Sequence, residues 1–74
     1  MRVTYIDHAF EQMALRQVSK SEVKEVLTHG KEEVQLDGRF RKTLEVGEGT
    51  LRVPFERLGP KPWTFNVITV VVVS

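Results

Sequence analysis

The spacing of apolar residues changes once along this chain, from a helical period near the start to a strand period after residue 30. In the first part, apolar residues recur three and four positions apart, which indicates amphipathic helices. We predict a first helix that is capped by Asp7 and ends near Gln17. Its core stripe consists of Phe10, Met13 and Ala14.

A second helix is predicted from the capping box Ser19-Lys20-Ser21-Glu22. In this motif the serine hydroxyl accepts a hydrogen bond from the glutamate N–H, and the glutamate side chain bonds back to the serine N–H. The core stripe that follows is Val23, Val26 and Leu27. Gly30 is expected to end this helix in the left-handed conformation.

Beyond Gly30 the apolar residues alternate with polar ones, which is typical of strands with one buried face. Asp37-Gly38 and Gly47-Glu48-Gly49 supply the turns. The predicted strands cover Glu33–Leu36, Arg39–Val46, Thr50–Glu56 and Trp63–Val73. Arg2–Ile6 is also extended in character, and it is either a short first strand or an ordered lead-in.

Two features of the later strands bear on the sheet. Pro54 has no N–H to donate, so this point is either a sheet edge or a bulge. The last strand is apolar on both faces, which suggests a central strand or one covered by a partner. The fold class that follows is α+β, a single domain over residues 1–74. In it two N-terminal helices pack on one face of a four-stranded antiparallel meander, with room for a short extra N-terminal strand.

Composition excludes several classes of function. The 74 residues include no cysteine, which removes disulfides and thiolate metal sites, and the two histidines lie far apart without a tight carboxylate cluster. We therefore expect no metal and no other cofactor. The longest apolar run, Val67–Val73, is far shorter than the roughly 20 residues that a membrane helix needs. The default expectation is a cytoplasmic protein without membrane contact.

The charges predict a local basic surface rather than a basic protein. Eleven Lys and Arg against ten Asp and Glu give a net charge of +1, which argues against a strongly basic nucleic-acid protein. The densest cationic cluster is Arg39, Arg41 and Lys42, and Arg52 follows on the next strand. This cluster is either an RNA contact or, more commonly, a solvated strand face.

The first helix carries the candidate chemistry. His8, Gln12 and Arg16 recur every fourth residue and drift only about 80° around the helix axis, so they form one polar ridge beside the core stripe. An imidazole titrates near neutrality and suits proton transfer. The alternative is structural: His8 is then a surface side chain, and Arg16 anchors the helix end by bonding carbonyls or by pairing with Glu11 or Glu22.

Several segments of the chain match one signature. The matching residues are His8-Ala9, Met13, Arg16, Val18-Ser19, Glu22-Val23, Val26-Leu27, Leu51-Arg52-Val53 and Val67-Ile68-Thr69-Val70. In them the chain resembles a small bacterial and phage family with the signature His-Ala-x-Glu-Arg-Met-x-x-Arg-Gly-Ile-Ser. That family in turn resembles the RelE/ParE-like (barnase–colicin–RelE) superfamily, which includes metal-independent RNases and toxins of toxin–antitoxin pairs.

The resemblance implies an endoribonuclease with its active cleft between a helical pair and an antiparallel sheet. It carries the catalytic roles to His8, Arg16 and Thr69, and it implies RNA and an antitoxin-type protein as partners. Two positions depart from the signature: Gln12 stands where it has Arg, and Gln17 where it has Gly. Because Gln offers neither charge nor a guanidinium fork, a phosphate cradle at residue 12 is weakened. The residues expected to contact nucleic acid are Gln12, Arg39, Arg41, Lys42 and Arg52.

Three hypotheses follow for function. The first is a RelE-like RNase, for which the group that complements His8 stays open between His29 and Glu11. The second is a non-catalytic module of the same fold that binds nucleic acid or a protein, which the Gln12 departure favours. The third is a domain that forms a homodimer through the Val-rich last strand, since an exposed apolar edge invites pairing.

Overall fold

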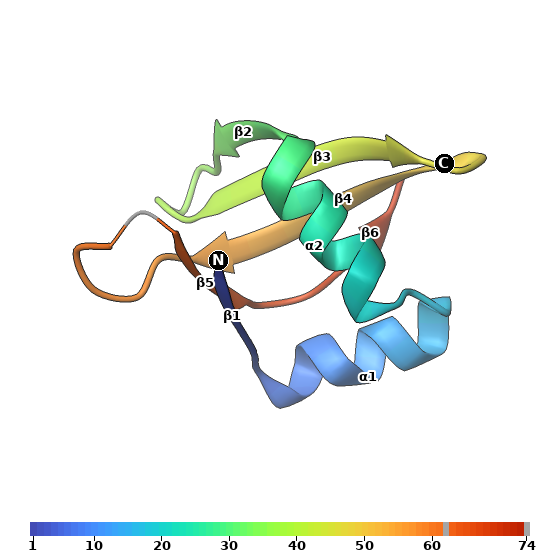
Figure 1. Cartoon of the computed structure of the whole chain (residues 1–74), viewed down its shortest axis with the longest axis horizontal. Helices are drawn as coiled ribbons and strands as arrows, with labels where there is room; N and C mark the ends of the chain where they lie inside the picture. Colours follow the sequence, from blue (N-terminus) through green and yellow to red (C-terminus); the bar gives the residue numbers. More distant parts are fainter. Residues whose placement is uncertain (62, 74) are drawn as a thin grey trace.

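The computed structural model, which describes residues 1–61 and 63–73, has two helices and one six-stranded sheet (Figure 1). The elements in chain order are β1 (Arg2–Tyr5), α1 (Asp7–Arg16), α2 (Lys20–His29), β2 (Lys31–Val34), β3 (Phe40–Val46), β4 (Gly49–Glu56), β5 (Thr64–Val67) and β6 (Val71–Val72). The α+β class is confirmed. Of the two alternatives for Arg2–Ile6, the short first strand is confirmed, over Arg2–Tyr5. The predicted four-stranded antiparallel meander is wrong in two respects, because β1 pairs in parallel with β5 and the last strand is divided into β5 and β6.

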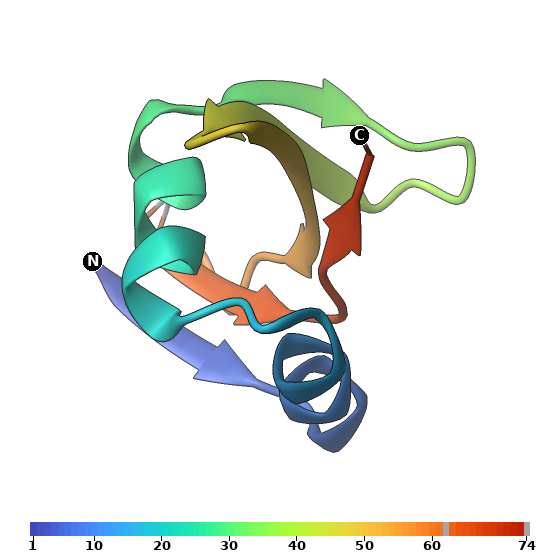
Figure 2. The same ribbon diagram turned by 90° about the vertical axis from the view of Figure 1, so that its right-hand side faces the viewer.

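The sheet is mixed because of β1. The strand order is β1-β5-β4-β3-β2, and β6 continues beside β4. The chain leaves β1 through both helices and returns by antiparallel strands, so that β5 runs parallel to β1, with Arg2 opposite Thr64 and Tyr5 opposite Val67. The sheet curls strongly around the core (Figure 2). Parallel pairing across 62 positions has no local sequence signal, which is why it was not predicted.

A bulge separates β5 from β6. Phe55 pairs with Val67 and Arg52 pairs with Val71, so between these pairs two residues of β4 face three residues, 68–70, of the last strand. The carbonyl oxygen of Pro54 accepts the Ile68 N–H at 3.0 Å within this interruption. Of the two alternatives predicted for Pro54, the bulge is confirmed and the sheet edge is wrong, since β4 is flanked on both sides.

Helix α2 packs across β3 and β4 and forms the centre of the core (Figure 1). The predicted stripe is confirmed, because Val23, Val26 and Leu27 are at most 1% exposed. The capping box at Ser19 and Glu22 is also present. Gly30 does end α2, but in an extended conformation rather than the predicted left-handed one. Glycine is needed there because a Cβ would meet the carbonyl oxygen of Val26.

Helix α1 starts at the end of β1 and runs away from this strand, with a different face inward from the predicted one (Figure 1). Ala9 and Met13 are buried, whereas Phe10 is 44% exposed and Ala14 is exposed. The cap is Ile6, without a side-chain hydrogen bond, and not Asp7. Within the described residues, neither helix has the length and apolar character needed to cross a bilayer.

Candidate functional site

The polar ridge of α1 runs along the border of its buried face. His8 lies in the first turn and is exposed, Gln12 is half-buried, and Arg16 is exposed as the last residue of the helix. Each of the first two immediately precedes a buried residue, Ala9 or Met13. Eight helical positions correspond to a rise of about 12 Å between His8 and Arg16. The ridge is therefore open to solvent at both ends and rests against the core at its middle.

The start of this helix adjoins the bulge that holds Thr69. The Ile6 N–H donates to the carbonyl oxygen of Val67 at 3.2 Å, which joins the beginning of α1 to the end of β5. Val70 is buried in the same core as Ala9 and Met13, and in both views the connection from β5 to β6 passes beside α1 (Figures 1 and 2). Thr69 is half-buried within that connection. The structure thus brings together the elements that carry His8 and Thr69.

The side chains of the ridge are unengaged. Within residues 1–61 and 63–73, His8, Gln12, Arg16 and Thr69 take part in no side-chain hydrogen bond or ion pair. The suggested pairing of Arg16 with Glu22 is not formed, because Glu22 Oε1 instead accepts from the Ser19 N–H at 3.0 Å. An imidazole and a guanidinium are thus left free to bind an anion.

The cations of the sheet do not join this ridge. Arg39 Nε lies 3.1 Å from Glu56 Oε1, and Arg41 Nε lies 3.7 Å from Glu33 Oε1. The second distance is too long for a hydrogen bond, so this is a loose ion pair. Both arginines lie at the β2–β3 side of the sheet, whereas α1 lies at the opposite edge, beside β1. Their charges are offset locally, which favours the solvated strand face over an RNA contact.

Lys42 and Arg52, the other two sheet cations expected to contact nucleic acid, also have partners within the protein. Lys42 Nζ donates to the carbonyl oxygen of Leu27 at 2.7 Å, where it satisfies the C-terminal end of α2. Arg52 Nε donates to Thr43 Oγ1 at 3.4 Å. Consecutive residues of a strand point to opposite faces of the sheet, so the side chains of Arg41 and Lys42 cannot lie on the same face. The predicted strand already implied this separation.

The sequence did not single out the hydroxyl of Tyr5. This atom is buried and has no hydrogen-bond partner within the described residues, and burial raises the pKa of Tyr5. The ring lies 5.1 Å from that of Phe10, between centroids, and Lys20 Nζ lies 5.7 Å from its centroid. Tyr5 therefore stays protonated at neutral pH inside an aromatic contact between β1 and α1.

Two further observations limit the chemistry. His29 is exposed in the last turn of α2. In the part of the chain that the structure describes, no group of three His, Cys, Asp or Glu side chains is arranged to hold a metal ion. The cavities of this surface lie away from the ridge, at the β1–β5 edge, at the β2–β3 turn and along the exposed side of α2.

Comparisons of the chain with models of known families, with curated proteins and with solved structures gave no match.

Proposed function

We propose that this chain is an RNA-directed domain of the RelE-like type whose site is the ridge of His8, Gln12 and Arg16 together with Thr69. The observation that supports the proposal is the free state of His8 and Arg16, two exposed groups on one helix face without partners among the described residues. The start of that helix is bonded to the strand that leads into the bulge of Thr69. Bulges occur frequently beside active sites, where they re-aim a side chain.

The chemistry of these groups fits metal-independent cleavage of a phosphodiester. Such cleavage needs a base for the 2′-hydroxyl proton, an acid for the leaving oxygen, and donors for the charge that develops on phosphorus. His8 supplies an imidazole nitrogen that accepts the 2′-hydroxyl proton, and solvent water protonates the leaving oxygen. Arg16 supplies a guanidinium fork for the phosphate oxygens, and Thr69 supplies a hydroxyl donor. Gln12 adds an amide donor without charge, which makes the phosphate contact weaker than a second arginine would.

The test uses single-stranded RNA with the full chain in the presence of EDTA. Binding is followed by fluorescence anisotropy of labelled RNA and cleavage by gel electrophoresis. We expect His8→Ala to abolish cleavage and Arg16→Ala to weaken binding. His29→Ala is the matched control, because His29 is also exposed but ends the helix that leads into β2, at the sheet edge opposite to α1, and so lies too far away to complement His8. Equal effects of His8→Ala and His29→Ala would exclude the ridge as the site.

A non-catalytic form of the same proposal has its own support. Gln12 removes one cation from the ridge, and the arginines of β3 and the turn before it are paired with glutamates. This form expects RNA binding that is lost in Arg16→Ala, retained in His8→Ala, and not accompanied by cleavage. The two forms are thus separated by the cleavage gel alone.

The edge of β6 favours a homodimer as a second candidate. Val71, Val72 and Val73 are 39–46% exposed, and β6 pairs with β4 along one of its edges. Exposed strand edges with apolar side chains recruit further strands. We expect sedimentation velocity to show a dimer that Val72→Lys converts to monomer, with Val34→Lys on the β2 edge as control. A monomer at all working concentrations would end this candidate.

A further inference from the structure

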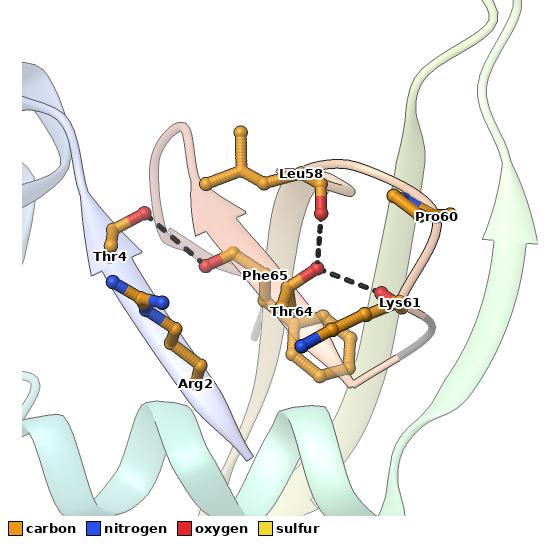
Figure 3. A pocket seen from close by; sticks show the side chains of 7 residues that line it. All are labelled: Arg2, Thr4, Leu58, Pro60, Lys61, Thr64 and Phe65. Atoms are coloured by element: carbon orange, nitrogen blue, oxygen red, sulfur yellow. Dashed lines mark hydrogen bonds between the residues drawn. The ribbon is translucent and has the colours of Figure 1, made fainter.

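A cavity of about 400 Å³ lies at the β1 edge of the sheet, under the loop that precedes β5 (Figure 3). Its apolar wall consists of Leu58, Pro60 and Phe65. Arg2, Thr4, Lys61 and Thr64 supply its polar groups. This volume lies in the range of pockets that bind small ligands. None of the residues of this pocket belongs to the site on α1.

The charge of the pocket has one sign. Arg2 and Lys61 both line it, and no Asp or Glu does. In the close-up, Arg2 stands on the β1 side and Lys61 on the loop side, with Thr64 between them (Figure 3). In contrast, the three ion pairs of the described residues use other arginines, namely Arg39, Arg41 and Arg57. A concave site with two unneutralised cations attracts an anion.

The walls of the pocket are held by hydrogen bonds that need no ligand. Thr64 is 8% exposed, and its Oγ1 lies 2.6 Å from the carbonyl oxygen of Leu58 and 2.8 Å from that of Lys61. The one proton of this hydroxyl is donated to either carbonyl, and both hold the loop against Thr64. Thr4 Oγ1 donates to Asn66 Oδ1 at 2.8 Å on the facing strand. The loop turns at Gly59, which has a φ of +68°. A site that is formed before binding loses less conformational entropy when the ligand arrives.

An aromatic side chain adjoins the cationic end. Trp63 is 54% exposed, and Lys61 Nζ lies 5.9 Å from the centroid of its ring. An exposed indole beside Lys61, at the rim of a pocket with two cations and an apolar wall, suits a ligand with a phosphate and a planar base, because bases stack on aromatic faces. We propose that this pocket binds a nucleoside monophosphate unit, either as a free nucleotide or within an RNA strand. The phosphate lies between Arg2 and Lys61, and the base lies toward Trp63 and Pro60.

The test exploits Trp63, the only tryptophan of the chain. The full chain is titrated with AMP, adenosine, inorganic phosphate and a ten-residue single-stranded RNA, with Trp fluorescence as the readout. We expect saturable quenching by AMP, weaker binding of adenosine, and about a tenfold loss of AMP affinity for each cation removed in Arg2→Ala and Lys61→Ala. Lys24→Ala, an exposed lysine on α2, is the matched control and should bind AMP normally.

A second measurement locates the ligand without relying on the variants. Amide chemical-shift changes on AMP addition should centre on Thr4 and Thr64, and His8→Ala should bind AMP as well as the original chain does. Quenching by RNA but not by AMP identifies the strand as the source of the nucleotide. Absence of saturable quenching by both, or unchanged affinity in the variant that lacks both cations, would overturn the proposal, and neither result depends on the site on α1.

Discussion

Gln17 holds the end of α1 in a backbone conformation that favours glycine. Its φ of 57° and ψ of 43° are left-handed. The Val18 N–H donates to the Met13 carbonyl at 2.8 Å, and the Gln17 N–H donates to that of Ala14 at 3.3 Å. These two bonds, with Met13 and Val18 both buried, form a Schellman motif in which residue 17 is the left-handed position. We therefore expect Gln17→Gly to stabilise the protein.

The size of the effect follows from two opposing terms. A left-handed residue with a Cβ costs roughly 1–2 kcal/mol relative to glycine. Glycine offsets this gain in stability by about 0.5–1 kcal/mol, because it loses more conformational entropy on folding than glutamine does. The exposed Gln17 side chain makes no hydrogen bond with the described residues, so no contact is lost. The net gain is about 0.5–1 kcal/mol, or a rise in Tm of about 2–8 °C for a domain of this size.

The assay is unfolding by heat and by urea, followed by far-UV circular dichroism. Gln17→Ala keeps the Cβ and removes the rest of the side chain, so it should change stability by less than about 0.5 kcal/mol. Gln17→Asn should fall between alanine and glycine, because Asn tolerates this conformation better than most residues. A gain in Gln17→Ala as large as that in Gln17→Gly would refute the explanation by backbone strain.

Three further predictions concern stability. Ser19→Ala removes the capping box and should lower the free energy of unfolding by about 1 kcal/mol in urea titration. Tyr5→Phe removes a buried hydroxyl without a described partner, so stability at pH 7 should stay equal or rise by about 1 kcal/mol. Because the folded pKa of Tyr5 is raised, the original chain should lose stability as the pH rises above about 10, where the unfolded chain ionises first, and Tyr5→Phe should lose less in thermal melts from pH 8 to 11. Arg57→Ala should cost about 1–2 kcal/mol, because its guanidinium bonds Glu32 at 2.7 Å and lies 5.3 Å from the ring centroid of Phe55.

Two of these predictions have a matched control variant, and the third has an outcome that would contradict it. Ser21→Ala lies in the same turn without a capping role and should be nearly neutral. Arg57→Met keeps the apolar stem over the aromatic rings and should lose less than Arg57→Ala. A decrease in the free energy of unfolding of more than about 1 kcal/mol in Tyr5→Phe would mean that the hydroxyl has a hydrogen-bond partner. If Tyr5→Phe lost as much stability at alkaline pH as the original chain, ionisation of Tyr5 would not be the cause of that loss.

Local signals in the sequence were sufficient for the start and the buried face of α2, though not for the conformation of Gly30 at its end. The capping box and the stripe of Val23, Val26 and Leu27 depend on residues within one or two turns of each other, and both are confirmed. The stripe of α1 depended on tertiary contact instead. Phe10 is the largest apolar residue of that helix, yet docking against the edge of the sheet buries Ala9 and leaves Phe10 on Tyr5. Periodicity shows that a helix is amphipathic but fixes its inward face only within about one residue.

The candidate site divides in the same way. Helix geometry alone predicted that His8, Gln12 and Arg16 form a polar ridge beside the buried face. In the structure His8 and Arg16 are exposed and Gln12 is half-buried, as expected for such a ridge. Whether the cations of the sheet are neutralised could not be predicted, because the pairing of Arg41 with Glu33 depends on the register between β2 and β3. The pocket between Arg2 and Lys61 joins residues 59 positions apart through the parallel β1–β5 pair. No local pattern announces such a pocket.

Pro54 lies directly opposite the bulge that contains Thr69. The carbonyl of Pro54 faces Ile68, and the N–H and C=O of a strand residue point to the same neighbour, so the missing N–H also faces the bulge. Pro54→Val would add a buried donor toward residues 68–70. Either that donor stays unpaired, at a cost of about 1–3 kcal/mol, or the bulge rearranges to accept it.

Amide shifts and hydrogen exchange distinguish these results, since rearrangement moves the signals of residues 68–70 and an unpaired donor lowers stability with the signals in place. Pro60→Val, in the exposed loop, is the control. If Pro54→Val changed neither stability nor these signals, proline would not be what keeps the bulge in register. If the bulge rearranges in Pro54→Val and RNA binding becomes weaker, the result would show that Pro54 positions Thr69 for RNA binding. Pro54 would then act as a positioning residue, fifteen positions before Thr69.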